Sequence, residues 1–306
     1  MKIKKSYAIY FIITVAILAV SYFIYVNNNV KVYQFEGNTL NYAQQRGKAT
    51  YEMSLKEENE SYKIYRLKYD SRPFMNFSTK IYGLFYMPKN KENEDIPAVI
   101  FLPGGGGSKE SRAIIAEFIA KEGYAAFIID QRGIGETGGY YLSLEEDYKV
   151  SAKGNEPTQH LAVFDVLRAY DVLSKIEGID KNNILVSGES MGGRSAIIAA
   201  SIDQRIKGVI GISTSGLHVK DENQPYTPYL ISIDPDHYAS KISPRYLIMI
   251  HSNNDTLITP KSAGVTYNLA NEPKKMFLIN ECNHGYCKEM GDTFKEAMKI
   301  IFENWF

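Results

Sequence analysis

The chain has 306 residues, of which 44% are apolar and 23% are charged, and its 35 basic residues balance its 35 acidic ones. This composition is typical of a folded globular protein and excludes collagen-like, low-complexity and intrinsically disordered classes. No basic run lies inside the chain, so the charge pattern predicts no nucleic-acid partner. Two cysteines leave little room for a disulfide scaffold or a cysteine-built metal site.

The amino-terminal segment, residues 1–26, has the features of a membrane anchor. Residues 8–26 form a 19-residue stretch without a charged side chain, which at about 1.5 Å per residue can cross a hydrocarbon core of roughly 30 Å. Three lysines precede this stretch, and tyrosines flank both of its ends. We therefore expect a single-pass helix in the lipid bilayer of the cell membrane, with the basic tip in the cytoplasm and the rest of the chain outside.

Two other interpretations of this segment stay open. Ala19-Val20-Ser21 has the small-x-small form of a signal-peptide cleavage site, although apolar residues directly after it argue against cleavage there. A buried core helix is the second alternative. Both an anchor and a signal peptide would place the remaining chain outside the cytoplasm.

The next segments differ in their patterns. Residues 27–61 are polar and show no sustained helical or strand period, so we interpret them as a spacer. Residues 62–69 and 78–87 alternate and are rich in aromatic and β-branched side chains, which predicts an antiparallel β-hairpin at the start of a catalytic domain spanning 62–306.

Beyond Pro97, short apolar runs alternate with amphipathic stretches. We predict strands at 98–102, 125–129, 184–187, 209–212, 246–250 and 275–279, and helices at 110–121, 157–175, 191–201, 262–270 and 292–305. Continuous apolar strands separated by helices indicate an α/β fold with a doubly wound, mostly parallel sheet covered on both faces. Residues 216–244 carry four prolines and no clear period, and we expect a small insertion there over the carboxyl edge of the sheet.

A candidate nucleophile follows the predicted strand at 184–187. Residues 188–192 read GESMG and open a helix of small residues. In this context the flanking glycines allow a sharp turn that holds the hydroxyl of Ser190 above the sheet. The helix amino terminus behind Ser190 offers unpaired N–H groups to negative charge that develops on a substrate.

Two further residues complete a candidate triad. Asp255 follows the strand at 246–250 and His284 follows the strand at 275–279, so both belong to loops at the edge of the sheet where Ser190 lies. A serine hydroxyl needs a base that a carboxylate orients, and the chain order Ser, Asp, His also agrees. Asp234 or Asp236 remain alternative sources of the carboxylate.

A glycine run at 104–107 follows the first strand of the parallel set. Glycines let backbone N–H groups approach an oxyanion without interference from side chains. We expect the oxyanion hole to consist of the N–H groups of Met191 and Gly105. A nucleotide-binding loop is the rival interpretation, but the run lacks the G-x-x-x-x-G-K-[ST] spacing.

Together with residues 130–135, which read DQRGIG, these motifs resemble the α/β-hydrolase superfamily, and within it the dienelactone-hydrolase-like and prolyl-oligopeptidase-like serine hydrolases. The likeness covers roughly residues 62–306. It implies that Asp130 and Arg132 form a buried polar pair at the rim of the site and that Glu189 is structural as well. The chain departs from dienelactone hydrolases proper in carrying Ser190 at the position of their cysteine. It also has Pro103 where many relatives have histidine, and no segment long enough for the peptidases' β-propeller precedes the domain.

Cys282 and Cys287 bracket His284. Outside the cytoplasm such a pair can be oxidised, so we hypothesise a disulfide that stiffens the loop presenting the histidine. Two free thiols are equally compatible with the spacing. Zinc binding by both cysteines and His284 is a further alternative, for which no fourth ligand is evident.

These residues predict a membrane-anchored, extracytoplasmic serine hydrolase that cleaves an ester, thioester or amide without a cofactor or metal. The expected substrate is a small acyl compound or a short peptide. A serine peptidase acting on short peptides and a non-catalytic binding protein on the same fold are the alternatives. Five tyrosines lie in segments that could roof the pocket, namely Tyr140, Tyr141, Tyr226, Tyr229 and Tyr238.

Overall fold

The computed structural model describes residues 10, 12–16, 31–75, 77–89, 95–220 and 223–303. Most of the predicted anchor at 8–26 lies outside these residues, and the part inside them, Tyr10 and residues 12–16, is helical. Within the described ranges, no helix combines the length and the hydropathy that a membrane span requires.

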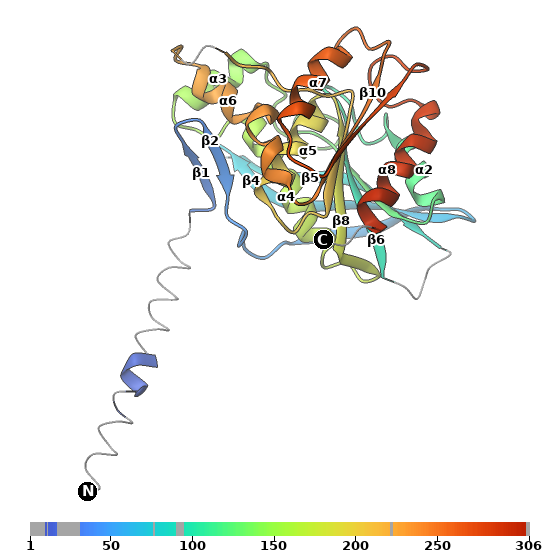
Figure 1. Ribbon diagram of the computed structural model, residues 1–306. Coiled ribbons are helices and arrows are strands. Elements are labelled where there is room, and N and C mark those ends of the chain that lie inside the picture. Colours follow the sequence, from blue (N-terminus) through green and yellow to red (C-terminus); the bar gives the residue numbers. More distant parts are fainter. Residues whose placement is uncertain are drawn as a thin grey trace, which may run out of the picture.

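A nine-stranded sheet forms the centre of the molecule (Figure 1). Its strands are β3 (Tyr51–Glu58), β4 (Tyr62–Phe74), β5 (Phe77–Pro88), β6 (Ile96–Leu102), β7 (Ala125–Ile129), β8 (Ile179–Glu189), β9 (Gly208–Ile212), β10 (Tyr246–Ser252) and β11 (Lys274–Ile279). Their order is β11-β10-β9-β8-β6-β7-β5-β4-β3, and β6 to β11 run parallel to one another. The predicted doubly wound, mostly parallel sheet is confirmed.

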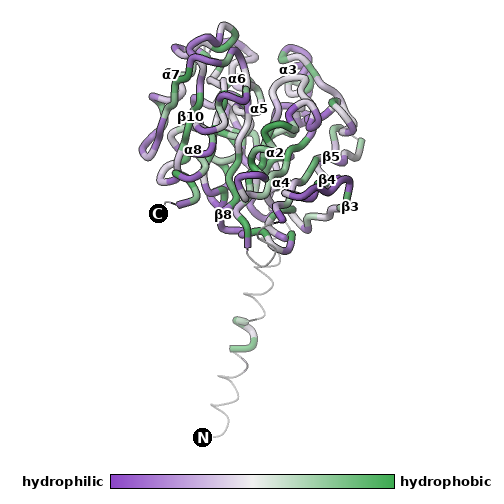
Figure 2. Tube along the Cα trace, turned by 90° about the vertical axis from the view of Figure 1, so that its right-hand side faces the viewer, coloured by the Kyte–Doolittle hydropathy of each residue, from purple (hydrophilic) through white to green (hydrophobic). Residues whose placement is uncertain are grey.

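Helices cover both faces of the sheet. On one face lie α4 (Thr158–Leu173), α5 (Met191–Ile202) and α7 (Pro260–Leu269), and on the other lie α2 (Ala113–Lys121) and α8 (Gly291–Glu303). Side chains of β6 alternate between the two layers: Ile100 packs in the first core and Phe101 in the second. Figure 2 shows hydrophobic stretches along the strands at the centre of the molecule, as burial on both sides of a parallel sheet requires.

The predicted β-hairpin is present as β4 and β5, which pair antiparallel with Tyr62 opposite Pro88 and Tyr69 opposite Ile81. The hairpin joins the parallel strands because β5 pairs antiparallel with β7. Both strands are longer than the alternation predicted, and their pairing continues to Phe74 and Phe77.

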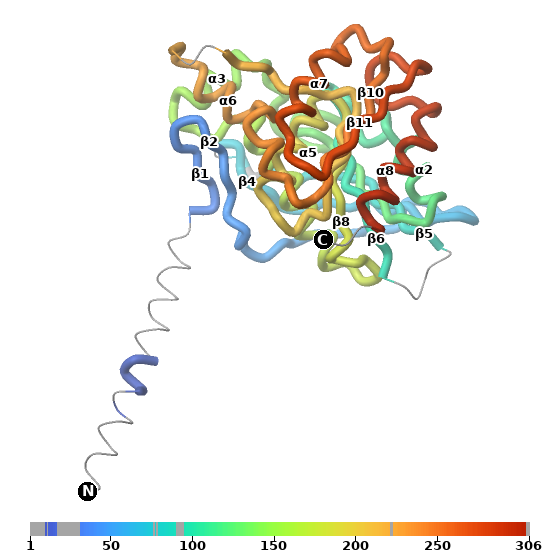
Figure 3. Tube along the Cα trace, in the orientation of Figure 1, coloured from blue at the N-terminus to red at the C-terminus, as the bar shows by residue number. Residues whose placement is uncertain are grey.

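Residues 27–61 are not only a spacer. They contain the two-stranded hairpin of β1 (Tyr33–Glu36) and β2 (Thr39–Tyr42), and they supply β3, the edge strand of the main sheet. Figure 3 shows β1 and β2 beside α6 (Thr227–Ser232), a segment far away in the sequence. Leu40 and Tyr42 are buried there. These strands escaped prediction because β1 and β2 are four residues long and β3 is exposed on both faces, which removes the apolar alternation.

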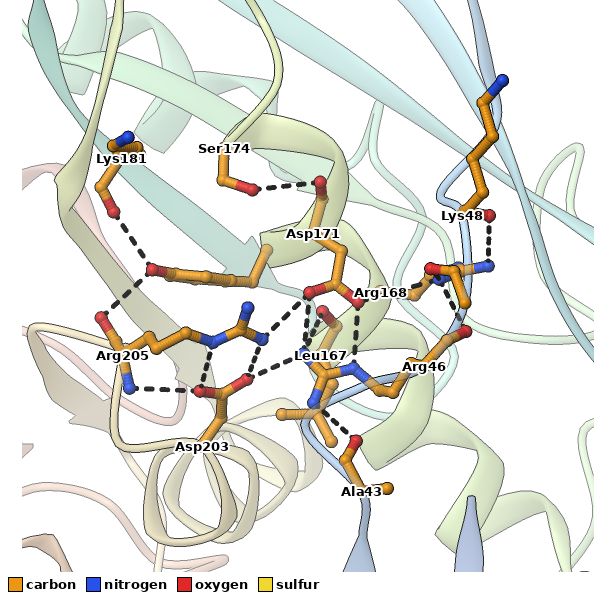
Figure 4. Close-up of polar contacts among 12 residues, drawn as sticks. Ala43, Arg46, Lys48, Leu167, Arg168, Asp171, Ser174, Lys181, Asp203 and Arg205 are labelled. Carbon is orange, nitrogen blue, oxygen red and sulfur yellow. Dashed lines mark hydrogen bonds and ion pairs between the residues drawn. The ribbon is translucent and has the colours of Figure 1, made fainter. Parts of the chain in front are cut away.

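Arg46, between β2 and β3, fastens this segment to the helical layer (Figure 4). Its Nε donates to Asp171 at 2.9 Å and its Nη2 donates to Asp203 at 2.7 Å, and all three residues are buried. Arg168 of α4 in turn donates to the backbone oxygens of Arg46, Gly47 and Lys48. The segment is therefore an integral part of the folded domain.

The predicted insertion at 216–244 contains α6 and two short 3-10 helices, η1 (Pro235–His237) and η2 (Ala239–Ile242), between β9 and β10. A further helix that the sequence did not predict, α3 (Leu144–Ala152), begins with a capping box between Ser143 and Glu146. The hydroxyl of Tyr229 in α6 donates to Asp147 of α3 at 2.9 Å, so the two helices are joined.

Candidate active site

Ser190 lies on a sharp turn between β8 and α5, as the motif predicted. Its backbone has φ 52° and ψ −120°, a strained combination for a residue with a side chain. A Cβ at Gly188 would lie 2.6 Å from the carbonyl carbon of Gly192, and a Cβ at Gly192 would lie 2.3 Å from the oxygen of Leu102. Gly188 is therefore required for the tight turn between β8 and α5, and Gly192 is required for α5 to approach the end of β6 so closely.

The strand order brings the site residues together. In the parallel pair of β6 and β8, Leu102 lies opposite Gly188, so the glycine loop after β6 is next to Ser190. In the parallel pair of β10 and β11, Ser252 lies opposite Ile279, so the loops that carry Asp255 and His284 are also neighbours. All four loops leave the carboxyl edge of the sheet, where sheets of this type place their sites.

Asp255 and His284 form a direct pair. The imidazole Nδ1 lies 2.9 Å from Oδ2 and 3.1 Å from Oδ1 of the buried carboxylate. The backbone N–H groups of Leu257 and Ile258 donate to Oδ1 at 3.0 and 2.9 Å, which fixes the orientation of the carboxylate. A carboxylate at Nδ1 holds the proton there and leaves Nε2 to act as a base.

The two alternative carboxylates lie elsewhere. Asp234 accepts the backbone N–H groups of Leu217 and Asp236 at 2.9 and 3.0 Å. Asp236 is 2.6 Å from the Nδ1 of His218. Of the three candidates, only Asp255 contacts His284.

Ser190 and His284 line one cavity of about 550 Å³. The glycine loop forms one wall, and the other lining residues are Ser111, Arg112, Tyr141, Glu189, Met191, Arg194 and Leu257. Among the residues that the structure describes, no hydrogen bond joins Ser190 and His284, whose Nδ1 is bonded to Asp255.

The predicted oxyanion donors face the same cavity. Among the described residues, no acceptor is hydrogen-bonded to the backbone N–H of Met191 or Gly105, whereas Gly104 donates to Glu189 at 3.2 Å. Met191 is the first residue of α5, where N–H groups have no partner inside the helix. The backbone N–H groups of Met191 and Gly105 can therefore donate to a ligand oxygen. The N–H of Gly104 is already bonded to Glu189 and is excluded as an oxyanion donor.

Glu189 connects both loops of the site. Its buried carboxylate accepts the N–H of Gly104, the N–H of Tyr286 at 2.9 Å and the Nε of Arg112. From the other side, Gln131 donates to the carbonyl oxygen of Pro103 at 2.6 Å. The amino-terminal end of the glycine loop is therefore held by two side chains, one from the last residue of β8 and one from a residue that follows β7.

Asp130 and Arg132 are buried but do not pair with each other, contrary to the expectation from the resemblance. Asp130 binds the ammonium group of Lys109 at 2.6 Å, and Arg132 binds Asp165 at 2.7 Å. The strand β7 ends before both residues, and each binds a different segment: Asp130 binds Lys109 beyond the glycine loop, and Arg132 binds Asp165 of α4.

The cysteines that flank His284 are joined by a disulfide, with 5.9 Å between their Cα atoms. The bond closes the loop that carries the histidine. The hydroxyl of Ser252 donates to the carbonyl oxygen of Cys282 and ties this loop to β10. Both sulfurs are bonded to each other, which leaves the alternative zinc site without its thiolate ligands.

Of the five tyrosines predicted near the pocket, Tyr141 lines the cavity. Tyr229 and Tyr238 are buried in the core. Tyr140 packs against Phe74 and Tyr226 packs against Tyr148, with ring centroids 5.7 and 6.3 Å apart.

Sequence reasoning missed three polar residues near the site, namely Arg112, Gln131 and Arg194. For Arg194 a signal existed. It stands in the first turn of the predicted helix that directly follows Ser190, at the edge of the sheet where the site lies.

Comparisons with known proteins agree with this architecture. The family described as alpha/beta hydrolase fold matches residues 97–232. The uncharacterized protein YfhR of Escherichia coli is 25% identical over 230 residues, which cover 72% of this chain and 75% of that protein. Acetyl esterase Axe7A of Xylanibacter ruminicola is 24% identical over 233 residues, 66% of this chain and 52% of that protein.

Among solved structures, an acetyl xylan esterase from Paenibacillus sp. R4 superimposes with a TM-score of 0.69 at 21% identity, covering 84% of this chain and 90% of that chain. Its likeness shows that the two chains share a fold. The matched family and this superposition agree that the chain has the α/β-hydrolase fold.

Proposed function

We propose that the protein is a serine hydrolase that cleaves a carboxylic ester through a Ser190-His284-Asp255 triad. The observation that carries this proposal is the buried Asp255 carboxylate on Nδ1 of His284, in the cavity that also holds Ser190 on its strained turn. A carboxylate, an imidazole and a hydroxyl in this order are the parts that nucleophilic acyl transfer needs.

The reaction would run in two halves. The Ser190 oxygen attacks the ester carbonyl while Nε2 of His284 takes the hydroxyl proton, and Asp255 stabilises the imidazolium that forms. The N–H groups of Met191 and Gly105 bind the oxygen that becomes negative. His284 then returns the proton to the departing alcohol. Water, deprotonated by His284, attacks the acyl-serine and releases the acid.

An ester is favoured over a peptide by the relatives. Similar proteins with stated activities include an acetyl esterase and an acetyl xylan esterase. A peptidase acting on short peptides stays the second candidate, because the triad itself does not separate amides from esters.

The proposal includes a membrane anchor at residues 8–26 and a catalytic domain outside the cytoplasm. The uncharged 19-residue stretch with its basic flank supports the anchor. The disulfide between Cys282 and Cys287 supports the location independently, because such bonds persist mainly in oxidising compartments.

Labelling with a fluorophosphonate tests the nucleophile. We expect the purified full-length protein to gain one adduct, located on Ser190 by peptide mapping, and Ser190→Ala to gain none. Ser190→Ala should also lower kcat on a short acetyl ester by about 10⁴-fold or more. Ser201→Ala removes a buried hydroxyl of the same helix outside the cavity and is the matched control.

Unchanged ester hydrolysis in a clean Ser190→Ala preparation would refute the assignment. Parallel assays of acetyl esters and short peptides with the same preparations decide between the two candidate functions.

A further inference from the structure

Arg194 brings a positive charge into the cavity that holds Ser190 and His284. It lies in the first turn of α5, where its N–H donates to the carbonyl oxygen of Ser190 at 3.2 Å. Because Arg194 lines the same cavity as Ser190 and His284, its side chain faces the space that a substrate bound at Ser190 would occupy.

The charge of Arg194 is not matched by a carboxylate. Among the described residues, its guanidinium makes no hydrogen bond or ion pair, whereas Arg112 in the same cavity is paired with Glu189. Asp234 acts on it through space, but the oxygens of that carboxylate accept backbone N–H groups. The cavity thus contains one cation that its own anions do not neutralise.

Burial makes this unmatched charge costly. Loss of water around the guanidinium lowers the pKa of Arg194, since desolvation penalises its charged form. A half-buried cation without an anion is destabilising unless a ligand supplies the missing charge. Guanidinium groups bind planar carboxylates through two parallel hydrogen bonds, a geometry that a flexible ammonium group does not provide.

We infer that the substrate carries a carboxylate close to its ester bond and that Arg194 binds this group. This inference rests on the proposed function. A singly charged carboxylate suits the cavity because it balances one arginine. A phosphate would bring about two negative charges next to the carboxylate of Glu189.

Two matched pairs of esters test the inference with the full-length protein. On the alcohol side, 4-acetoxybenzoate is compared with the neutral 4-acetoxybenzamide. On the acyl side, monomethyl succinate is compared with the neutral methyl succinamate. Each kcat/KM is divided by the spontaneous hydrolysis rate of that ester, and the anionic-to-neutral ratio is the measured quantity. A ratio taken within one preparation is independent of the fraction of folded protein.

We expect a ratio of about 10 or more for at least one pair, because a desolvated bidentate ion pair contributes at least that factor. Arg194→Met should lower this ratio to about 1 or below, and Arg194→Lys should leave an intermediate value. Lys299→Gln removes one exposed positive charge on α8 and should leave the ratio unchanged.

Ratios near 1 for both pairs in the unmodified protein would overturn the inference, and so would an undiminished ratio in Arg194→Met. In both cases Ser190-dependent hydrolysis of the neutral esters would leave the proposed function standing. Absence of Ser190-dependent hydrolysis of all four esters would overturn the proposed function and the inference together.

Discussion

A single carboxylate, that of Glu189, connects the two loops from which the proposed oxyanion donor and the proposed base come. Glu189 directly precedes Ser190 in the sequence. Its carboxylate binds the glycine loop at Gly104 and the histidine loop at Tyr286. Its charge is balanced by Arg112. The loops are therefore aligned with the nucleophile, and with each other, through one buried group.

Glu189→Gln should impair the proposed reaction more than the binding of substrate. The amide keeps the shape of the side chain but presents an NH₂ group to one of the backbone N–H donors, so one loop loses its attachment. We expect kcat to fall by about 10- to 100-fold, because small misplacements of reacting groups slow a reaction by such factors. KM should change less than threefold.

The free energy of unfolding should fall by about 2 kcal/mol in the same variant, because a buried donor is left without its acceptor. Steady-state kinetics and urea unfolding measure the two effects. Glu177→Gln, at an exposed position outside the cavity, is the control. A kcat within threefold of the unmodified protein would show that Glu189 does not position the loops.

The sequence was informative about residues whose role follows from local pattern. Ser190 stands in a five-residue motif, and Asp255 and His284 each follow a readable strand. The structure pairs Asp255 with His284 and places Ser190 in the same cavity, while their catalytic roles stay a prediction. The role inferred for Arg194 rests on its lack of a paired carboxylate among the described residues, which only the folded chain reveals.

At the scale of elements, the loop between β11 and α8 depends on its disulfide. The bond joins residues with a sequence separation of five, for which the loss of chain entropy in the unfolded state amounts to about 2 kcal/mol. The loop also presents His284 to the cavity.

Replacing both cysteines by serine should therefore lower the free energy of unfolding by about 2 kcal/mol and make it insensitive to reductant. The unmodified protein should lose a similar amount when dithiothreitol is added. Guanidinium chloride unfolding with and without dithiothreitol measures both quantities. The prediction fails if thiol titration of the unreduced, unfolded protein finds two free thiols.

Elements with a regular pattern of apolar residues could be predicted from the sequence, and elements without such a pattern could not. The strands β6 to β11 were placed to within two residues, apart from the amino end of β8, because most of them are apolar runs buried on both faces of the sheet. Residues 27–61 resembled a spacer because the strands in this segment are short or exposed and because part of its attachment is polar. Arg46 holds this segment through two buried carboxylates contributed by distant helices, a contact that only the folded chain brings together.

For the molecule as a whole, this buried ionic cluster makes stability depend on pH. Burial alone raises the pKa of Asp203, but hydrogen bonds from Arg205 and the charge of Arg46 outweigh it and lower the pKa from 3.8 to about 2. Because the pKa of Asp203 is lower in the folded protein, its carboxylate stabilises the fold at pH values above its pKa in the unfolded chain. This contribution is lost as the pH falls from 3.8 toward 2. The shift corresponds to about 2 kcal/mol at neutral pH.

The difference in unfolding free energy between the unmodified protein and Asp203→Asn should shrink by about 1 kcal/mol between pH 6 and pH 3, since part of the linkage is then lost. Urea unfolding at several pH values measures it. For Asp292→Asn, at an exposed position on α8, we expect a difference that does not vary with pH. A pH-independent difference for Asp203→Asn would contradict the account of the cluster.

The open sheet ends at β3, whose residues are exposed on almost every side chain. An unpaired edge strand is a template on which a second chain can add by backbone hydrogen bonding. Four of the eight residues of β3 are charged, namely Glu52, Lys56, Glu57 and Glu58. Burying these charges against another strand would be unfavourable. The edge strand β3 therefore also protects the sheet from edge-to-edge aggregation.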